Sequence, residues 1–378
     1  MSYDLLMEME LQSQVDARQA LRSSRGLHLA SILAVAYLLV IAYASLQPFS
    51  GWWTPPDEIR QFLTAPWPRY ITLEDVLVNI AAYVPLGFLL ARALMRALGN
   101  ARAVLCALVL VAAVSLAMET VQMFMPTRIA SNVDLVTNTI GGLIGALSAP
   151  LFSPTRLLGM RVARVRRAWF LYGPGSDSGL VLLSLWLATQ IHPTMQLFGT
   201  GYLRNTFELP PWVMHTPPLL LVSEAAVACF NVLGLGLVAV TLARPSVSRG
   251  AVLGAVLGSA FVAKTLVAVA VAKSAGPLAW LTPGVAIGIV AAAVLLYGLA
   301  RLPQRARWIA AATSFVAAIV AINIGPDNPY QTIPPQLLAG PTHFLSFSGI
   351  VRAVSELWPF LAVAYAIEQA YRARPGRV

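Results

Sequence analysis

The chain has 378 residues, of which 58% are hydrophobic and only 11% are charged, whereas roughly 25% of the residues of an ordinary soluble domain are charged. This composition excludes a soluble globular protein. The formal net charge of +10 does not indicate nucleic-acid binding, because the basic residues stand between apolar stretches and not on one folded face. The composition therefore predicts an all-α, polytopic membrane protein.

Apolar stretches of similar length follow one another along the whole chain. About 20 apolar residues in a helix cross a hydrocarbon core that is about 30 Å thick. With Arg, Pro and Gly taken as boundaries, the sequence predicts transmembrane helices at residues 28–47, 72–95, 103–125, 134–152, 178–198, 217–243, 251–272, 280–300, 308–324 and 349–370. We therefore expect a transmembrane helical bundle of about ten transmembrane helices.

The basic residues predict how this bundle is oriented. Of the 26 Lys and Arg residues, 19 lie on the side of the N-terminal tail and six on the opposite side, with Lys264 inside a predicted span. Short loops rich in Lys and Arg stay in the cytoplasm, so we expect both termini there. Acidic residues in the first 27 positions favour an uncleaved first helix over a cleaved signal peptide.

The charge pattern also predicts the domain organisation. A basic stretch with five arginines separates a front half of four predicted spans from a back half of six. The predicted parts are a cytoplasmic tail at 1–27, a four-helix membrane domain at 28–152, a basic cytoplasmic linker at 153–177, a six-helix membrane region of unknown role at 178–370 and a cytoplasmic tail at 371–378. The linker arginines either bind anionic lipid or only fix the orientation.

Polar residues gather at one end of the second, third and fourth predicted spans. Ionisable groups inside a span cost at least about 2.5 to 3.5 kcal/mol on insertion scales, so they often mark function. The seven candidate ligand-binding residues are Asp75, Asn79, Glu119, Gln122, Arg128, Asp134 and Asn138. Because these span ends share the outer side, we expect a polar pocket that opens to the outer face. The alternative is packing alone, with Arg128 paired to a carboxylate and the amides joining helices.

Proline and glycine residues in the same spans predict how the helices pack. Pro85 removes a helical hydrogen bond, so we expect a kink there, with Gly87 next to it. The spacing of Gly141 and Gly145 is the small-residue pattern that lets two helix backbones approach closely.

The back half has its own ionisable residues inside predicted spans. At 1.5 Å per residue, Glu224, Lys264 and Glu356 come to similar depths. We expect Lys264 to pair with one of the two carboxylates, the alternative being a lysine that reaches outward to the interface. The histidines and the two cysteines lack the spacing of metal ligands, so no metal site, disulfide or cofactor is predicted.

The polar residues of the front half also carry a family resemblance. The motifs are Asp75-x3-Asn79-x5-Pro85-x-Gly87, Glu119-x2-Gln122 with Pro126-x-Arg128, and Asp134-x3-Asn138-x2-Gly141-x3-Gly145. In this order they resemble the VanZ-like domain of bacterial membrane proteins, over roughly residues 30 to 152. The resemblance implies a protein of the bacterial cytoplasmic (inner) membrane, in a family whose founding member lowers susceptibility to teicoplanin. Typical members have four or five spans, so the back half is a departure.

Three functions are consistent with these observations. The favoured one is a non-enzymatic cell-envelope factor that binds a lipid-linked or amphipathic molecule, with membrane lipid, a lipid-linked cell-wall precursor or a lipoglycopeptide as partner. The second is an enzyme acting on a lipid-linked glycan precursor, with Glu119 as general acid and Asp134 or Asp75 as base. The third is a small-solute transporter, indicated by the ionisable residues of the back half.

Overall fold

The computed structural model describes residues 30–46, 52–54, 61–67, 71, 73–125, 128–153, 155–190, 199–204, 216–271, 278, 280–326, 328 and 342–373. Every regular element in these ranges is a helix, and the β-type pairing there is a single bridge between Phe170 and Ala243. The prediction of an all-α fold is therefore confirmed.

Five described helices are long and apolar enough to cross a membrane. They are Asp75–Gln122, Asn132–Phe152, Pro217–Leu242, Arg249–Leu266 and Gln304–Ile324, and Ala30–Leu46 and Pro283–Leu299 are shorter apolar helices. The chain is thus a helical membrane protein. The expected number of about ten spans is not confirmed.

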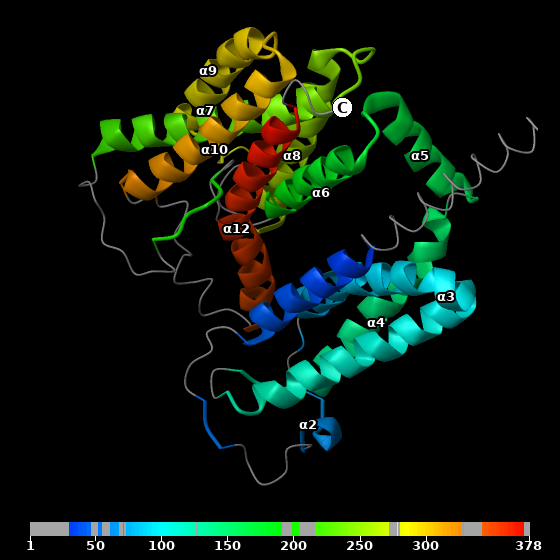
Figure 1. Ribbon diagram of the computed structural model, residues 1–378. Helices are drawn as coiled ribbons and strands as arrows, with labels where there is room; N and C mark the ends of the chain where they lie inside the picture. The colour runs from blue at the N-terminus through cyan, green and yellow to red at the C-terminus, as the bar shows by residue number, and fades with distance from the viewer. Residues whose placement is uncertain are drawn as a thin grey trace, which may run out of the picture. The chain divides into compact units, whose positions relative to one another are not determined.

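The chain forms two compact units (Figure 1). The front unit contains Met1–Val162 and Pro341–Ile350, and the back unit contains Ala163–Gly340 and Val351–Val378. The segment expected as a basic linker contains a helix, α5 (Leu157–Trp169), in which the division between the units falls.

The front unit is built around one long helix that turns back on itself. Besides Ala30–Leu46 it contains α2 (Gln61–Thr64), α3 (Leu73–Gln122), α4 (Asn132–Ser148) and the 3-10 helix η1 (Ala149–Phe152). Tyr83 and Ser115 of α3 form a side-chain hydrogen bond, although a straight helix would separate them by about 48 Å. Figure 1 shows the two arms of α3 side by side.

The turn between the two arms is at Gly99. Its dihedral angles, φ 74° and ψ 173°, are the non-helical values in α3, and a positive φ favours glycine. The arms correspond to the predicted spans at 72–95 and 103–125. Pro85 lies inside the first arm, where the backbone dihedrals stay helical, so the break in α3 is at the glycine and not at the proline.

Glycines bring α4 into backbone contact with the first arm of α3. A Cβ atom on Gly87 would lie 2.0 Å from the carbonyl oxygen of Gly142, and one on Gly145 would lie 2.0 Å from that of Val84. Gly141 packs in the same way against the backbone of the first arm. No larger side chain fits at these positions without separating the helices.

The back unit surrounds a helix that is buried along most of its length. Its helices are α6 (Pro174–Thr189), α7 (Pro217–Leu242), α8 (Arg249–Val271), α9 (Pro283–Leu299), α10 (Gln304–Ile324) and the part of α12 (Thr342–Arg372) from residue 351 onward. α7 is strongly apolar apart from a few buried polar residues, and it is not divided into an apolar and a polar face, which is typical of a core helix. Beside it, the rings of Phe315 and Trp358 pack edge to face at 5.4 Å, and the Trp358 indole donates to the carbonyl of Leu182.

Candidate functional site

Two buried carboxylates of the front unit meet at the beginning of α4. The Asn79 side-chain amide, on the first arm of α3, donates to Asp134 Oδ1 at 2.9 Å. Glu119, near the end of the second arm, accepts a hydrogen bond of 2.8 Å from the backbone N–H of Ser131. Ser131 is the N-cap residue of α4, and its own hydroxyl accepts from the N–H of Val133. Both carboxylates therefore lie at one helix N-terminus.

The position of these carboxylates explains how the fold tolerates them. Glu119 is 3% exposed and Asp134 is 6% exposed, and a negative charge on one disfavours a negative charge on the other. Arg128 attracts Glu119, and the N-terminus of α4 adds the partial positive charge of its unpaired N–H groups. A carboxylate at a helix N-terminus gains about 0.3 to 1 kcal/mol, and up to about 2 kcal/mol when partly buried. The helix end thus offsets part of the excess negative charge.

Gln122 and Arg128 bind the end of the first described helix. The Gln122 amide donates to the carbonyl of Ser45 at 3.0 Å, and the Arg128 guanidinium donates to the carbonyl of Ala44 at 3.2 Å. These carbonyls belong to the last turn of Ala30–Leu46, where the helix itself offers no partner. Burial lowers the pKa of Arg128, and the charge of Glu119 acts in the opposite direction. Gln122 thus joins α3 to the first described helix, and Arg128 joins the segment before α4 to the same helix.

Asn138 lies deeper in the unit and has an oxygen without a partner. Its side-chain amide donates to Ser115 Oγ at 3.0 Å, and Ser115 is also hydrogen-bonded to Tyr83. The residue is 4% exposed, yet its Oδ1 has no hydrogen-bond partner among the described residues. A buried acceptor left unpaired costs about 1 to 3 kcal/mol, which makes this atom a point where a donor would bind favourably.

The structure brings six of the seven predicted residues to one end of the front unit, and Asp75 lies half-buried one turn before Asn79. The sequence interpretation missed Tyr83, Ser115 and Ser131. A signal for two of them was present, because Tyr83 follows Asn79 by four residues and Ser115 precedes Glu119 by four, so each shares a helical face with a predicted residue.

In the back unit, Glu224 is held by two side chains from other parts of the chain. Its Oε2 accepts from the Thr282 hydroxyl at 2.7 Å and its Oε1 accepts from the Asn328 amide at 3.1 Å. Lys264 and Glu356 are also buried. The pairing of Lys264 with a carboxylate stays a prediction.

A non-helical segment of the back unit, residues 199–204, is mostly buried. The N–H of Gly201 donates to the carbonyl of Ser355 in α12 at 3.0 Å, and Asn231 of α7 accepts from a hydroxyl of the segment at 3.2 Å. Asn323 of α10 donates to the carbonyl of Gly201 at 2.7 Å and accepts from a backbone N–H of the segment at 2.9 Å. The polar groups of this segment are thus bound by three helices.

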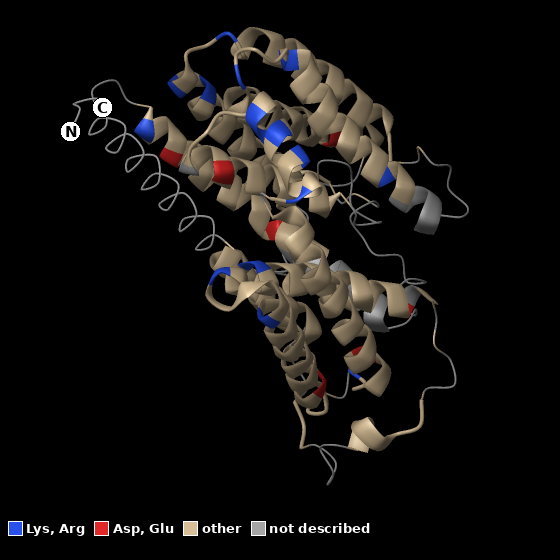
Figure 2. Ribbon diagram, turned by 90° about the vertical axis from the view of Figure 1, so that its right-hand side faces the viewer, with Lys and Arg blue, Asp and Glu red and all other residues tan. Residues whose placement is uncertain are grey.

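Among the described residues, Asp and Glu are few and Lys and Arg are more numerous (Figure 2). Within that part of the chain, no three His, Cys, Asp or Glu residues are grouped so that they could hold a metal ion. The front site offers carboxylates, side-chain amides and one guanidinium.

Comparisons with known proteins identify one part of the chain. Residues 27–153 match the family model described as VanZ/LLP1. Searches of curated proteins and of solved structures find no match to the chain. The matched range contains all seven predicted site residues and the helices of the front unit that carry them. The front part of this helical membrane protein, residues 27–153, is therefore a VanZ-like domain.

Proposed function

We propose that the protein is a non-enzymatic factor of the bacterial cell envelope that binds a lipid-linked or amphipathic molecule in its front unit. The proposed consequence is a lower susceptibility to teicoplanin-type glycopeptides. The observation that carries this proposal is the buried Asn138 Oδ1, which has no partner among the described residues and lies on the same helix as Asp134.

The residue types of the site support binding of a polar head group. Asn138 Oδ1 and the carboxylate oxygens of Glu119 are acceptors, so they favour a ligand rich in O–H and N–H donors. Sugar hydroxyls and peptide amides are such donors. The apolar helices around the site suit a molecule that also carries a hydrocarbon tail.

The proposed topology puts this site at the outer leaflet. In this topology the chain crosses the cytoplasmic membrane about ten times and has both termini in the cytoplasm. The topology is inferred from the distribution of Lys and Arg. The break at Gly99 supports it, because each arm of α3 has more than 20 residues, enough to cross the hydrocarbon core. In this topology the turn at Gly99 is cytoplasmic and Asn79 and Glu119 lie near the outer side.

The test is susceptibility to teicoplanin and vancomycin in a glycopeptide-sensitive Gram-positive host. Wild type, Asn138→Leu and Glu119→Gln are expressed at matched membrane levels, with Glu224→Gln as a control for loss of a buried carboxylate in the other unit. We expect wild type and the control to raise teicoplanin tolerance and both front-unit variants to lose the effect. The proposal is contradicted if wild type leaves teicoplanin tolerance unchanged. It is also contradicted if both front-unit variants raise teicoplanin tolerance as much as wild type does.

A second candidate function, small-solute transport by the back unit, is favoured by the segment Gly199–Arg204. Non-helical backbone at membrane depth occurs where it is buried in protein or lines a cavity, and broken helices carry the binding sites of many transporters. The segment reaches Asn231 and Ser355, which lie in the middle of α7 and α12. Glu224 is the buried carboxylate nearest in sequence to Asn231 on α7.

Proteoliposomes loaded with a pH-sensitive dye test this candidate through proton flux under an imposed potential. We expect wild type to exceed empty liposomes and Glu224→Gln to lose most of the difference, while Glu119→Gln keeps it. Equal flux in wild type and empty liposomes argues against proton-coupled transport.

A further inference from the structure

An apolar groove with a basic rim lies among α7, α8 and α9 of the back unit. It has a volume of about 470 Å³, within the range of natural ligand sites, and we call it the α7–α9 groove. Its walls are lined mainly by Val232, Val240, Leu253, Leu257, Ile289 and Leu296. Arg249 and Arg301 line its end, where α8 begins and α9 has just ended.

The rim of this groove carries positive charge that no described carboxylate balances. Arg249 and the nearby Arg307 repel each other, and none of Arg249, Arg301 and Arg307 forms an ion pair with a carboxylate in the part of the chain that the structure describes. Arg307 Nε is in addition buried without a hydrogen-bond partner there. Like charges held together in this way favour an anionic ligand.

One arginine of the rim is held in place by an aromatic residue of the same groove. The Arg301 guanidinium lies 3.7 Å from the ring centroid of Tyr297 and donates to the Tyr297 carbonyl at 3.0 Å. These contacts keep the charge of Arg301 at the end of the groove. An anion at this position would meet Arg249 as well.

We propose that the α7–α9 groove binds an anionic phospholipid, with an acyl chain along the apolar walls and the phosphate at Arg249 and Arg301. The shape and the charge of the site both support this ligand, because a phospholipid joins a hydrocarbon chain to a phosphate group. An apolar helix is the alternative occupant of the groove. It would cover the apolar walls but would leave Arg249 and Arg301 without a counter-charge. The proposal is independent of the function assigned to the front unit.

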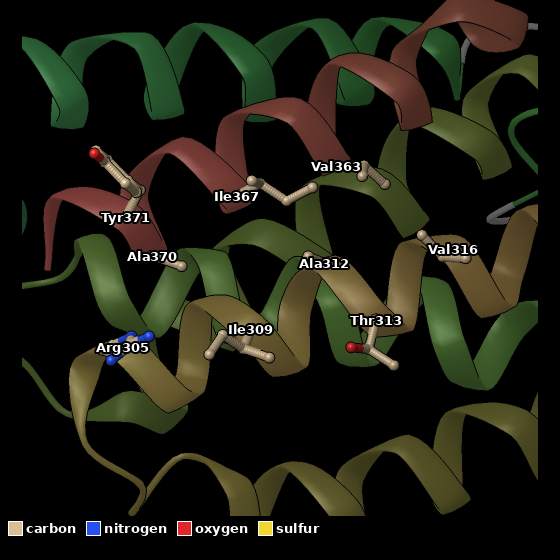
Figure 3. A pocket seen from close by; sticks show the side chains of 9 residues that line it. All are labelled: Arg305, Ile309, Ala312, Thr313, Val316, Val363, Ile367, Ala370 and Tyr371. Atoms are coloured by element: carbon tan, nitrogen blue, oxygen red, sulfur yellow. The ribbon is translucent and has the colours of Figure 1, made fainter. Parts of the chain in front are cut away.

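A second groove of the same unit provides an internal comparison. It runs between α10 and α12, also has a volume of about 470 Å³, and has Arg305 as its one basic lining residue. Figure 3 shows Arg305 and Tyr371 at one end and Val316 at the other. Glu368, on the same helix as Tyr371, forms an ion pair with Arg372. We expect this groove to accept acyl chains with less preference for anionic head groups.

The experiment measures lipid binding to the purified full-length protein in detergent by native mass spectrometry. The probes are phosphatidylglycerol, phosphatidylcholine and glycerol phosphate, the last of which has the anionic group without acyl chains. We expect one phosphatidylglycerol to bind with clear preference over phosphatidylcholine. In the double variant Arg249→Gln with Arg301→Gln, the affinity should fall about fivefold for each charge removed.

Two further variants separate charge from shape. Leu257→Trp fills the groove without changing its charge and should reduce phosphatidylglycerol binding, whereas Arg305→Gln in the second groove should leave the preference intact. Equal affinity for the two lipids, or unchanged binding in the double arginine variant, overturns the proposal. If glycerol phosphate competes for the groove as well as phosphatidylglycerol does, the proposed binding of an acyl chain along the apolar walls is wrong.

Discussion

In the front unit, the buried carboxylates Glu119 and Asp134 lie at the beginning of a helix, where backbone N–H groups need acceptors. In the back unit, Glu224 lies two turns inside α7, where the helix backbone is already paired, and it is held by side chains of Thr282 and Asn328. The first arrangement uses a backbone N–H at a helix end to hold Glu119 and a side chain to hold Asp134, whereas the second relies on side chains alone. The two units therefore respond differently to substitution.

The largest expected effect tests the backbone contact that assembles the front unit. Gly145→Leu places a side chain where a Cβ alone would lie 2.0 Å from the Val84 carbonyl, so the helices must separate. We expect a loss of at least about 3 kcal/mol of stability and little folded protein in the membrane. Thermal unfolding measures the loss of stability, and the abundance of the variant in the membrane measures the loss of folded protein. Gly254→Leu in α8, where a Cβ meets nothing within 4 Å, is the matched control and should be tolerated.

A smaller effect is expected where the back unit holds its non-helical segment. Asn323→Leu removes a donor to the Gly201 carbonyl and an acceptor for the Leu203 N–H, leaving buried backbone groups unpaired. Each buried backbone group left unpaired costs about 1 to 3 kcal/mol of stability, so the variant should unfold at a clearly lower temperature than wild type. Asn132→Leu, which removes one exposed hydrogen bond to Ala65, should have little effect. If both variants lose the same amount of stability, the contact between Asn323 and the non-helical segment does not stabilise the back unit.

Two substitutions of Glu119 sharpen the comparison of helix-end and mid-helix carboxylates. Glu119→Leu leaves the Ser131 N–H without its acceptor and should cost about 1 to 3 kcal/mol. Glu119→Gln keeps a carbonyl oxygen for that N–H and removes the repulsion by Asp134, so its stability should change by less than about 1 kcal/mol. Unfolding of both purified variants measures the difference. If Gln is as damaging as Leu, the charge itself stabilises the unit.

A further prediction concerns the turn of α3. Gly99→Ala places a Cβ on a residue with φ 74° and ψ 173°, a backbone region that is essentially restricted to glycine. Because nothing lies within 4 Å of that Cβ, the cost of about 1 to 3 kcal/mol comes from backbone strain alone. Gly298→Ala in α9, which also has open space but no such φ, is the control. The difference in unfolding temperature between the two variants measures the strain.

The helical class and the grouping of polar residues in the front unit could be predicted from the sequence because both follow from local patterns. Asp134 and Asn138 share a helical face through their spacing, and the two arms of α3 follow from two apolar runs. The packing of Asn323 against the Gly199–Arg204 segment joins residues about 120 positions apart, so no local pattern indicates it. The same holds for Asn328 and Glu224.

The turn at Gly99 also determines which length changes the chain can accept. Tyr83 and Ser115 are each 16 residues from Gly99, and Asn79 and Glu119 are each 20 residues from it. One residue inserted beside the turn would shift one arm by about 1.5 Å and rotate it by about 100°. The site residues would then lose their mutual alignment, although the insertion lies about 30 Å away along the helices. Insertions and deletions at this turn should therefore be rare among natural relatives that keep the site, unlike changes in ordinary connecting loops.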